Sequence, residues 1–242
     1  MTNYTAAIII IGDEILSGRT TDTNTQYIAN ALSEIGINLI EVRIIGDDRS
    51  TIIKTVLKLS ARYNYVFTTG GIGPTHDDIT SEAISTAFGL KYVCNDKAYE
   101  ILERGYALRG EKMNNNRAKM AYMPEGSELI IPDVGAPGYI VKNVFVLAGV
   151  PEIMCSMMQS VLPLLKKGKV VKSKHIEIMV GESAVAGEFQ RLQNKYPQIS
   201  MGSYPFQKDG KHGTSLVLRS NDYKSLEIAY QELEKMLHKN FY

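Results

Sequence analysis

Hydrophobic positions follow two periods along the first two thirds of the chain. Short apolar runs predict buried strands, and apolar residues three or four positions apart predict helices. The predicted strands are 6–11, 38–45, 65–67, 139–141 and 144–147, and the predicted helices are 24–35, 50–62, 79–88, 96–108, 117–123 and 150–165. In the helix at 50–62, Ile53, Val56 and Leu57 are expected to face inward, with Ile52 as a further candidate. Alternating strands and helices favour an α/β fold, with a mostly parallel sheet covered on both faces.

The last third has a different order of elements. It follows the basic segment 166–174, which we interpret as a turn-like linker rather than a nucleic-acid patch. Beyond it the pattern predicts β-α-β-β-α, with a hairpin turn at Asp209-Gly210. The expected elements are a strand at 175–180, a helix at 182–195, strands at 199–204 and 214–219, and a helix at 222–237. We therefore expect two domains, 1–167 and a small α+β domain at 170–242.

Composition narrows the class of protein. The 242 residues are 44% hydrophobic and 22% charged, with a formal net charge of +1, which offers no field for nucleic acid or an anionic membrane. Cys94 and Cys155 are expected to be free buried thiols of a reducing cytosol. The apolar run at 8–11 lacks a basic segment before it and is too short for a membrane span. We expect a cytoplasmic protein.

A glycine-rich turn lies between the predicted strand at 65–67 and the helix at 79–88. Gly70, Gly71 and Gly73 would let the backbone approach a ligand closely, and the helix start offers N–H groups to an anion. Asp77 and Asp78 follow and supply the hard oxygen ligands that Mg²⁺ prefers. The turn therefore suggests a phosphate cradle beside a cation. In the alternative interpretation, the two aspartates merely cap a helix.

Two other predicted strands bring acidic residues to the same edge of the sheet. Gly12-Asp13-Glu14 follows the first strand and Gly46-Asp47-Asp48 follows the second. Either could be an ordinary turn with a helix cap, but together they gather carboxylates that repel one another unless a cation or a proton intervenes. Ligands of open α/β sheets bind at this edge. The chain contains neither a GxxxxGK[ST] nor an HExxH motif, and its four histidines are scattered.

The residues of these turns resemble a known family. Segments 69–78 (TGGIGPTHDD), 10–18 (IIGDEILSG) and 136–138 (APG) are similar to the N-terminal domain of the competence/damage-inducible CinA proteins, within the MoaB/MogA/MoeA molybdopterin-binding superfamily. The resemblance covers about residues 4–165, and the tail resembles the small KH-like domain that follows in CinA. No counterpart of the family's C-terminal amidase domain, which deamidates nicotinamide mononucleotide, occurs in these 242 residues, so we expect a short form.

The resemblance implies a three-layer α/β/α fold and a site. Asp78 and Asp48 would be the catalytic acids, and Asp78, Asp48 and Asp77 would hold a divalent cation such as Mg²⁺, Mn²⁺ or Co²⁺. The implied phosphate- and nucleotide-binding residues are Gly70, Gly71, Gly73, Pro74, His76, Asp13, Glu14, Arg117, Lys119, Pro137 and Gly138. The implied reaction is hydrolysis of a dinucleotide diphosphate such as ADP-ribose or FAD. Ile72 and Asp77 depart from the molybdopterin enzymes and favour the CinA-like branch.

Several alternatives stay open. Arg117 and Lys119 could be surface cations, His76 an exposed loop residue, and Pro137-Gly138 only a turn into a strand. The protein could instead bind or adenylate molybdopterin, or bind nucleotides without catalysis. We expect a nucleotide or pterin ligand, a homo-oligomer (dimer or trimer) and no membrane partner. We also expect no nucleic-acid partner, because the GxxG segment 210–213 falls in a hairpin rather than between helices.

Overall fold

The protein is described by a computed structural model that covers residues 4–241. Its contacts divide the chain into two units, Met1–Gly168 and Lys169–Tyr242. In the first unit the strands are β1 (Thr5–Ile11), β2 (Asn38–Ile45), β3 (Tyr65–Thr69), β4 (Tyr92–Cys94), β5 (Tyr122–Pro124), β6 (Glu128–Ile130), β7 (Gly138–Val141) and β8 (Val144–Leu147). Its helices are α1 (Asp13–Leu16), α2 (Asn24–Glu34), α3 (Arg49–Arg62), α4 (Thr80–Phe88), α5 (Asp96–Ala107), α6 (Asn115–Lys119) and α7 (Pro151–Val161), followed by a 3₁₀ turn η1 (Leu162–Leu164).

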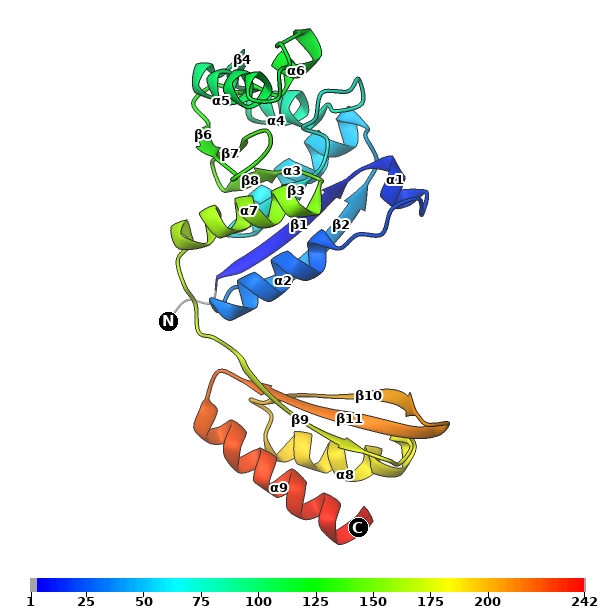
Figure 1. The fold of residues 1–242 in the computed structure, drawn as a ribbon. Coiled ribbons are helices and arrows are strands. Elements are labelled where there is room, and N and C mark those ends of the chain that lie inside the picture. The colour runs from blue at the N-terminus through cyan, green and yellow to red at the C-terminus, as the bar shows by residue number, and fades with distance from the viewer. Residues whose placement is uncertain (1–3, 242) are drawn as a thin grey trace. The chain divides into compact units, whose positions relative to one another are not determined.

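The main sheet of the first unit has the strand order β2-β1-β3-β8-β7-β6 (Figure 1). The four strands β2, β1, β3 and β8 are parallel, whereas β7 and β6 are added antiparallel. This arrangement confirms the predicted α/β fold with a mostly parallel sheet. The parallel strands end at a common edge, which receives the turns after β1, β2 and β3.

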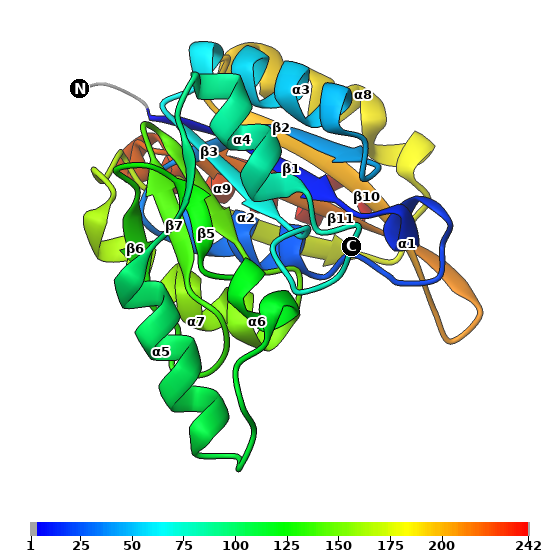
Figure 2. The same cartoon turned by 90° about the horizontal axis from the view of Figure 1, so that it is seen from above.

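Helices cover both faces of this sheet, with α3 and α4 on one side and α2 and α7 on the other (Figure 2). Strand β1 explains the arrangement: Ala7, Ile9 and Ile11 belong to the core under α3 and α4. The alternate residues Ala6, Ile8 and Ile10 belong to the core under α2 and α7. A strand buried on both faces is apolar throughout, which is why its sequence shows a continuous run rather than alternation. The methionines of α7 fill the second core.

The prediction of a helix at 117–123 is confirmed for residues 117–119 and wrong beyond them. Helix α6 ends at Lys119, and β5 pairs antiparallel with β4 through Tyr92↔Pro124 and Cys94↔Tyr122. Met123 and Pro124 are buried while Tyr122 is exposed, and the pairing with β4 identifies the segment as a strand. Three-residue strands such as β4, β5 and β6 are too short to show a period, and β4 and β6 were not predicted.

The inward face of α3 also differs from the prediction. Ile52, Val56 and Leu59 are fully buried, whereas Leu57 is 43% exposed. The buried residues are four and three positions apart and form one stripe, from which Leu57 is rotated by about 100°. The two cysteines are free as predicted but only half-buried, and partial burial raises the pKa of both thiols.

The second unit has the predicted β-α-β-β-α order. Its elements are β9 (Lys172–Ile178), α8 (Glu182–Lys195), β10 (Ser200–Lys208), β11 (Lys211–Ser220) and α9 (Tyr223–Phe241), and its antiparallel sheet has the order β10-β11-β9. The hairpin turn at Asp209-Gly210 has φ of 51° and 74°, the conformation that an Asp-Gly pair favours. The end of segment 166–174 was predicted wrongly as a turn, because Lys172–Lys174 belong to β9. There Lys174 pairs with Glu227.

Candidate phosphate and nucleotide site

The glycine turn after β3 has a backbone that glycine alone adopts readily. Gly70 and Gly71 have φ of 101° and 68°. A Cβ atom on Gly70 would collide with the carbonyl oxygen of Ile11, and one on Gly71 would collide with the hydroxyl of Thr80. The turn thus lies against the end of β1 and the start of α4 as closely as a bare backbone allows.

The amide groups of this turn are not equivalent. Gly70 donates its N–H to the carbonyl of Leu147 at 3.3 Å and so continues the sheet. The amides of Gly71 and Gly73 have no acceptor within residues 4–241. Helix α4 begins beside them, and its N-cap residue Ile79 makes no side-chain capping bond. Gly71 and Gly73, rather than all three predicted glycines, are therefore the amides open to an anion.

The loop between the glycines and α4 closes on itself. The Thr75 amide donates to Oδ2 of Asp78 at 2.7 Å, and the Thr75 hydroxyl lies 2.5 Å from carboxylate oxygens of both Asp77 and Asp78. The Lys119 ammonium group donates a hydrogen bond to the Thr75 carbonyl oxygen. The bond from the Thr75 hydroxyl is the main cause of the lowered pKa of Asp77. These contacts hold Asp78 beside Gly73, where its carboxylate lines the cavity described below.

A second carboxylate group lies where β1 and β2 end. The Asp13 amide donates to Oδ2 of Asp47 at 3.0 Å. Burial raises the pKa of Asp47, and the neighbouring charges of Asp13, Glu14 and Asp77 raise it further. Three connections therefore bring carboxylates close enough to interact, as the sequence predicted. Within residues 4–241, no three His, Cys, Asp or Glu side chains are already arranged to hold a metal ion.

Asp48 occupies a different environment from Asp47. It is exposed and caps α3, accepting bonds from the Thr51 amide at 2.8 Å, the Thr51 hydroxyl at 2.7 Å and the Ser50 hydroxyl at 2.9 Å. The Thr51 and Ser50 bonds lower the pKa of Asp48. All three donors bind the same oxygen, Oδ1. The catalytic and metal-binding role suggested for Asp48 stays a prediction. Asp47, in contrast, lies close enough to Asp13, Glu14 and Asp77 for their charges to affect it.

A cavity of about 850 Å³ opens beside the glycine turn. Glu14, the turn from Gly70 to Pro74 and Asp78 line one part of it. Apolar and aromatic residues of α5, together with Arg104 and Arg109, line another part, and a third wall comprises segment 132–136 and the start of α7. Leu108 and Val134 in these walls are 84% and 73% exposed. The cavity offers a polar cradle and an apolar surface to one ligand.

The turn at Ala148-Gly149-Val150 forms the floor of the cavity next to the glycines. A Cβ atom on Gly149 would lie 3.2 Å from the Cα atom of Gly70. Asn24, which is 6% exposed, donates from Nδ2 to the Gly149 carbonyl at 2.8 Å. The buried amide of α2 therefore holds this floor in place.

The other predicted residues lie at varying distances from the cavity. Pro74 lines it, whereas His76 is exposed on the loop. Arg117 pairs with Glu111 and stacks on the Tyr106 ring at 4.2 Å, so it lies behind a cavity-lining side chain. Pro137 and Gly138 are buried at the start of β7, where a Cβ atom on Gly138 would collide with the Val146 carbonyl. Close packing of two strands thus accounts for this glycine.

No sequence motif marked the α5 wall or residues 132–135 as part of the site. The signal in α5 was its amphipathic pattern, which is indistinguishable from that of a helix packed on a core. Asp47 was also passed over in favour of its neighbour, although it follows β2 as directly as Asp13 follows β1.

Comparison with known proteins identifies the family of the first unit. The model of the family described as "probable molybdopterin binding domain" matches residues 7–167. The chain belongs to this family. Residues 170–242 match the model of the FAD synthase middle domain. No helix in the described part of the chain has both the length and the apolar character needed to cross a bilayer.

Relatives of similar sequence support the same assignment. A protein of Archaeoglobus fulgidus is 35% identical over 240 residues, covering 96% of this chain and 97% of that protein. A "putative competence-damage inducible protein" of Acetivibrio thermocellus is 33% identical over 215 residues, covering 85% of this chain. The chain spans 52% of that bacterial relative.

A solved structure resembles the first unit. The crystal structure of the protein CinA with unknown function from Thermoplasma acidophilum matches with a TM-score of 0.61 and 29% identity. The match covers 66% of this chain and 96% of that one. The resemblance to the CinA N-terminal domain, inferred from three motifs, is confirmed.

Proposed function

We propose that this protein hydrolyses the diphosphate bridge of a nucleotide such as ADP-ribose or FAD. The observation that carries the proposal is the joining, in one cavity, of the glycine turn, Asp78 and an apolar wall with two arginines. A dinucleotide diphosphate needs each of these surfaces, and the cavity of about 850 Å³ falls within the size range of small-molecule sites. The match of residues 170–242 to a FAD synthase domain supports a nucleotide ligand.

The glycine turn would bind the diphosphate. The free amides of Gly71 and Gly73 belong to the same loop as Asp78, and the start of α4, which has no side-chain cap, adds a favourable dipole. Glu14 in the cavity wall repels a phosphate unless a cation screens the charge.

A divalent cation is part of the proposal. Carboxylate oxygens are its preferred ligands, and Mg²⁺ is commonly held by one or two carboxylates together with substrate phosphates rather than by a complete protein cage. Asp78 would hold it, together with Asp77 or Asp47. That arrangement fits a protein whose described residues contain no ready group of three ligands. When bound, the cation would neutralise phosphate charge and lower the pKa of a water molecule.

Tyr106 is the side chain of the α5 wall best suited to a flat ring. Its ring lies 4.5 Å from the guanidinium carbon of Arg109 and 4.2 Å from that of Arg117. These cation–π contacts fix the orientation of the ring. Because these guanidinium groups already lie over the Tyr106 ring, a base or flavin ring would pack against the arginine–tyrosine cluster as a whole while the diphosphate binds at the glycines.

The test is direct measurement of product. Purified protein would be incubated with ADP-ribose or FAD and with Mg²⁺, Mn²⁺ or Co²⁺, and AMP release would be followed by chromatography. We expect release that requires the metal and is lost in Asp78→Asn. Binding of these nucleotides without turnover would show instead a non-catalytic nucleotide-binding module.

A second candidate is binding or adenylation of molybdopterin, favoured by the description of the family whose model matches residues 7–167. Oxidation of the purified protein followed by fluorescence detection would reveal a retained pterin. A stoichiometric pterin without any hydrolysis of ADP-ribose or FAD would replace the first proposal by this one.

A further inference from the structure

Strand β2 forms an edge of the main sheet (Figure 1). Three of its side chains expose an apolar stripe. Ile40, Val42 and Ile44 are 55%, 39% and 42% exposed, and they alternate with Glu41 and Arg43. Edge strands are usually protected by charges, prolines or a covering segment, because an exposed apolar edge pairs with other chains. The stripe contains no charge or proline, although β2 has one extra residue, Ile40, where its register against β1 shifts between Ala6 and Ala7.

The backbone of β2 also has an open side. Gly12 donates its N–H to the Ile45 carbonyl at 3.1 Å, so the peptide groups of Ile45 face β1. The backbone groups of successive residues in a strand point alternately to its two sides. The N–H and C=O groups of Ile44 and Val42 therefore point away from β1, toward the open edge. No strand within residues 4–241 pairs with that edge.

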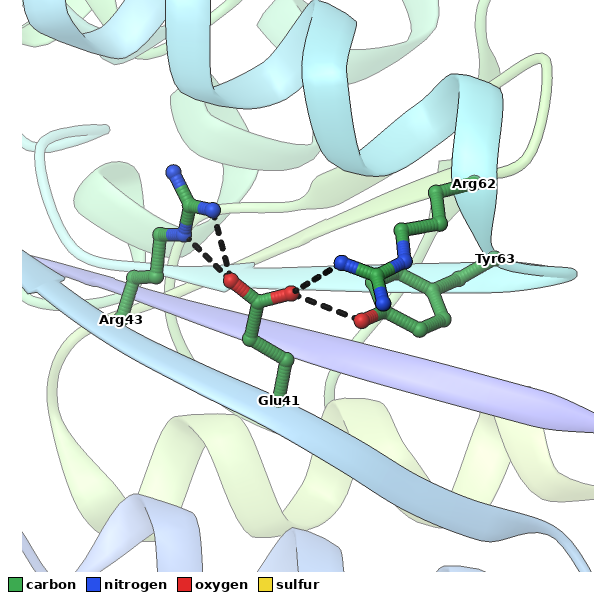
Figure 3. Close-up of polar contacts among 4 residues, drawn as sticks. All are labelled: Glu41, Arg43, Arg62 and Tyr63. Carbon is green, nitrogen blue, oxygen red and sulfur yellow. Dashed lines mark hydrogen bonds and ion pairs between the residues drawn. The ribbon is translucent and has the colours of Figure 1, made fainter.

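The opposite face of β2 carries a fixed pair of charges (Figure 3). Glu41 accepts bonds from Arg43 Nε at 2.7 Å and from the Tyr63 hydroxyl at 2.7 Å, and Arg62 lies 3.7 Å away. The Tyr63 and Arg43 bonds lower the pKa of Glu41, which keeps it ionised. Two opposite charges therefore stand in fixed positions on either side of Val42.

We propose that β2 is a self-association surface, and that its partner is the antiparallel β2 of a second copy of this chain. The segment Ile40-Glu41-Val42-Arg43-Ile44 is symmetric about Val42 in its apolar residues and opposite in its charges. A two-fold axis at Val42 would place Ile40 opposite Ile44 of the partner subunit, and Glu41 opposite Arg43 of the partner subunit. Both faces of the pairing are then complementary.

A parallel, in-register pairing would not be complementary. It would place Glu41 beside Glu41 and Arg43 beside Arg43, and like charges directly opposite one another destabilise a sheet. The charge pattern thus selects the antiparallel arrangement and a second copy of the same strand, and it predicts a dimer.

The first test compares two lysine substitutions at equally exposed apolar positions. Val42→Lys places two ammonium groups across the axis, whereas Leu57→Lys changes α3, where Leu57 is 43% exposed and Val42 39%. Sedimentation velocity over a dilution series should show a wild-type dimer whose dissociation constant rises about tenfold or more in Val42→Lys. Leu57→Lys should leave it unchanged. A monomeric wild type at the highest soluble concentration, or equal dimerisation of both variants, would overturn the proposal.

The second test is chemical and works even if Val42→Lys fails to fold. Val42→Cys, in a background with Cys94→Ser and Cys155→Ser, brings two thiols together at the axis, where Cα atoms of a hydrogen-bonded pair are about 5.5 Å apart. Mild oxidation should cross-link most of the protein through a disulfide that reductant reverses. Leu57→Cys in the same background should stay uncross-linked. A dimer that persists without cross-linking in Val42→Cys would show that another surface joins the copies.

Discussion

The connections after β2 and after β3 contain similar residues, but their aspartates make different hydrogen bonds. Each brings a glycine and two adjacent aspartates to the same edge of the sheet. After β2, Asp48 caps α3 and fills the helix start with the chain's own carboxylate. After β3, Asp78 turns back onto Thr75 instead, and α4 has no side-chain cap.

The difference shows what makes a helix start available to a ligand. At a capped N-terminus, a neighbouring side chain accepts hydrogen bonds from the otherwise free N–H groups and offsets part of the helix dipole. The start of α4 has no side-chain cap, although its Thr80 N–H is bonded to the Gly71 carbonyl at 3.0 Å, and the two free glycine amides lie next to it. The same residue types therefore stabilise a helix in one connection and offer a site in the other.

The largest expected effect is the loss of nucleotide binding when the glycine turn after β3 is altered. Gly71→Val should weaken nucleotide binding about a hundredfold or more, because its side chain would collide with Thr80 and the backbone would be strained at φ 68°. Gly89→Val is the matched control: it has φ 65° at the other end of α4 and no atom within 4 Å of an added Cβ. Calorimetry should show lost binding in the first variant only. Equal affinity in both would place the phosphates elsewhere.

The next effect separates the aspartates by activity. Asp78→Asn should lower metal-dependent turnover by about a hundredfold or more, since it removes a charged oxygen from the cavity while an amide oxygen can still accept from Thr75. Asp48→Asn should retain turnover within about threefold, because asparagine caps a helix as well as aspartate does. Initial rates at saturating metal measure both. A larger loss in Asp48→Asn than in Asp78→Asn would reverse the assignment.

A smaller effect concerns stability. Asp48→Ala should lower the thermal midpoint by roughly 2–6 °C through loss of the α3 cap, while Asp48→Ser should retain most of it. Differential scanning calorimetry compares the two variants. An unchanged midpoint in Asp48→Ala would mean that the cap contributes nothing to folding.

The smallest effect is a difference in pH dependence between adjacent residues. The pKa of Asp48 is lowered from 3.8, so its contribution to stability is present above that value and is lost as the pH falls below it. The pKa of Asp47 is raised from 3.8 by burial, so the folded state binds its proton more tightly and stability declines as the pH rises through the raised pKa.

Denaturant titrations from pH 3 to pH 7 on Asp47→Asn and Asp48→Asn would resolve these opposite slopes. Asp47→Asn should be more stable than the wild type at pH values above the raised pKa of Asp47. Asp48→Asn should no longer show the part of the acid-induced loss of stability that comes from protonation of Asp48. Slopes of the same sign in the two variants would contradict the environments described for them.

Local signals were enough for much of the fold. Continuous apolar runs identified β1 and β8, and helical spacing followed by Gly36 identified α2. The segment at 117–123 failed because Met123 and Ala121 fit a helix or a short strand equally well, and only pairing with β4 decides between them. Leu57 failed because one apolar residue beside the buried stripe cannot be told from a member of it.

The sequence by itself determined the glycine turn, the acidic edge and the two kinds of domain, because turn chemistry and hydrophobic period depend on near neighbours along the chain. Tertiary structure gave Asp47 and Asp48 different environments, since these depend on where α3 begins and on an amide from the β1 connection. It also decided that α5 and segment 132–136 complete the cavity around residues 70–78. Those segments meet only because the sheet and its helices fold them together, and no spacing in the sequence encodes that meeting.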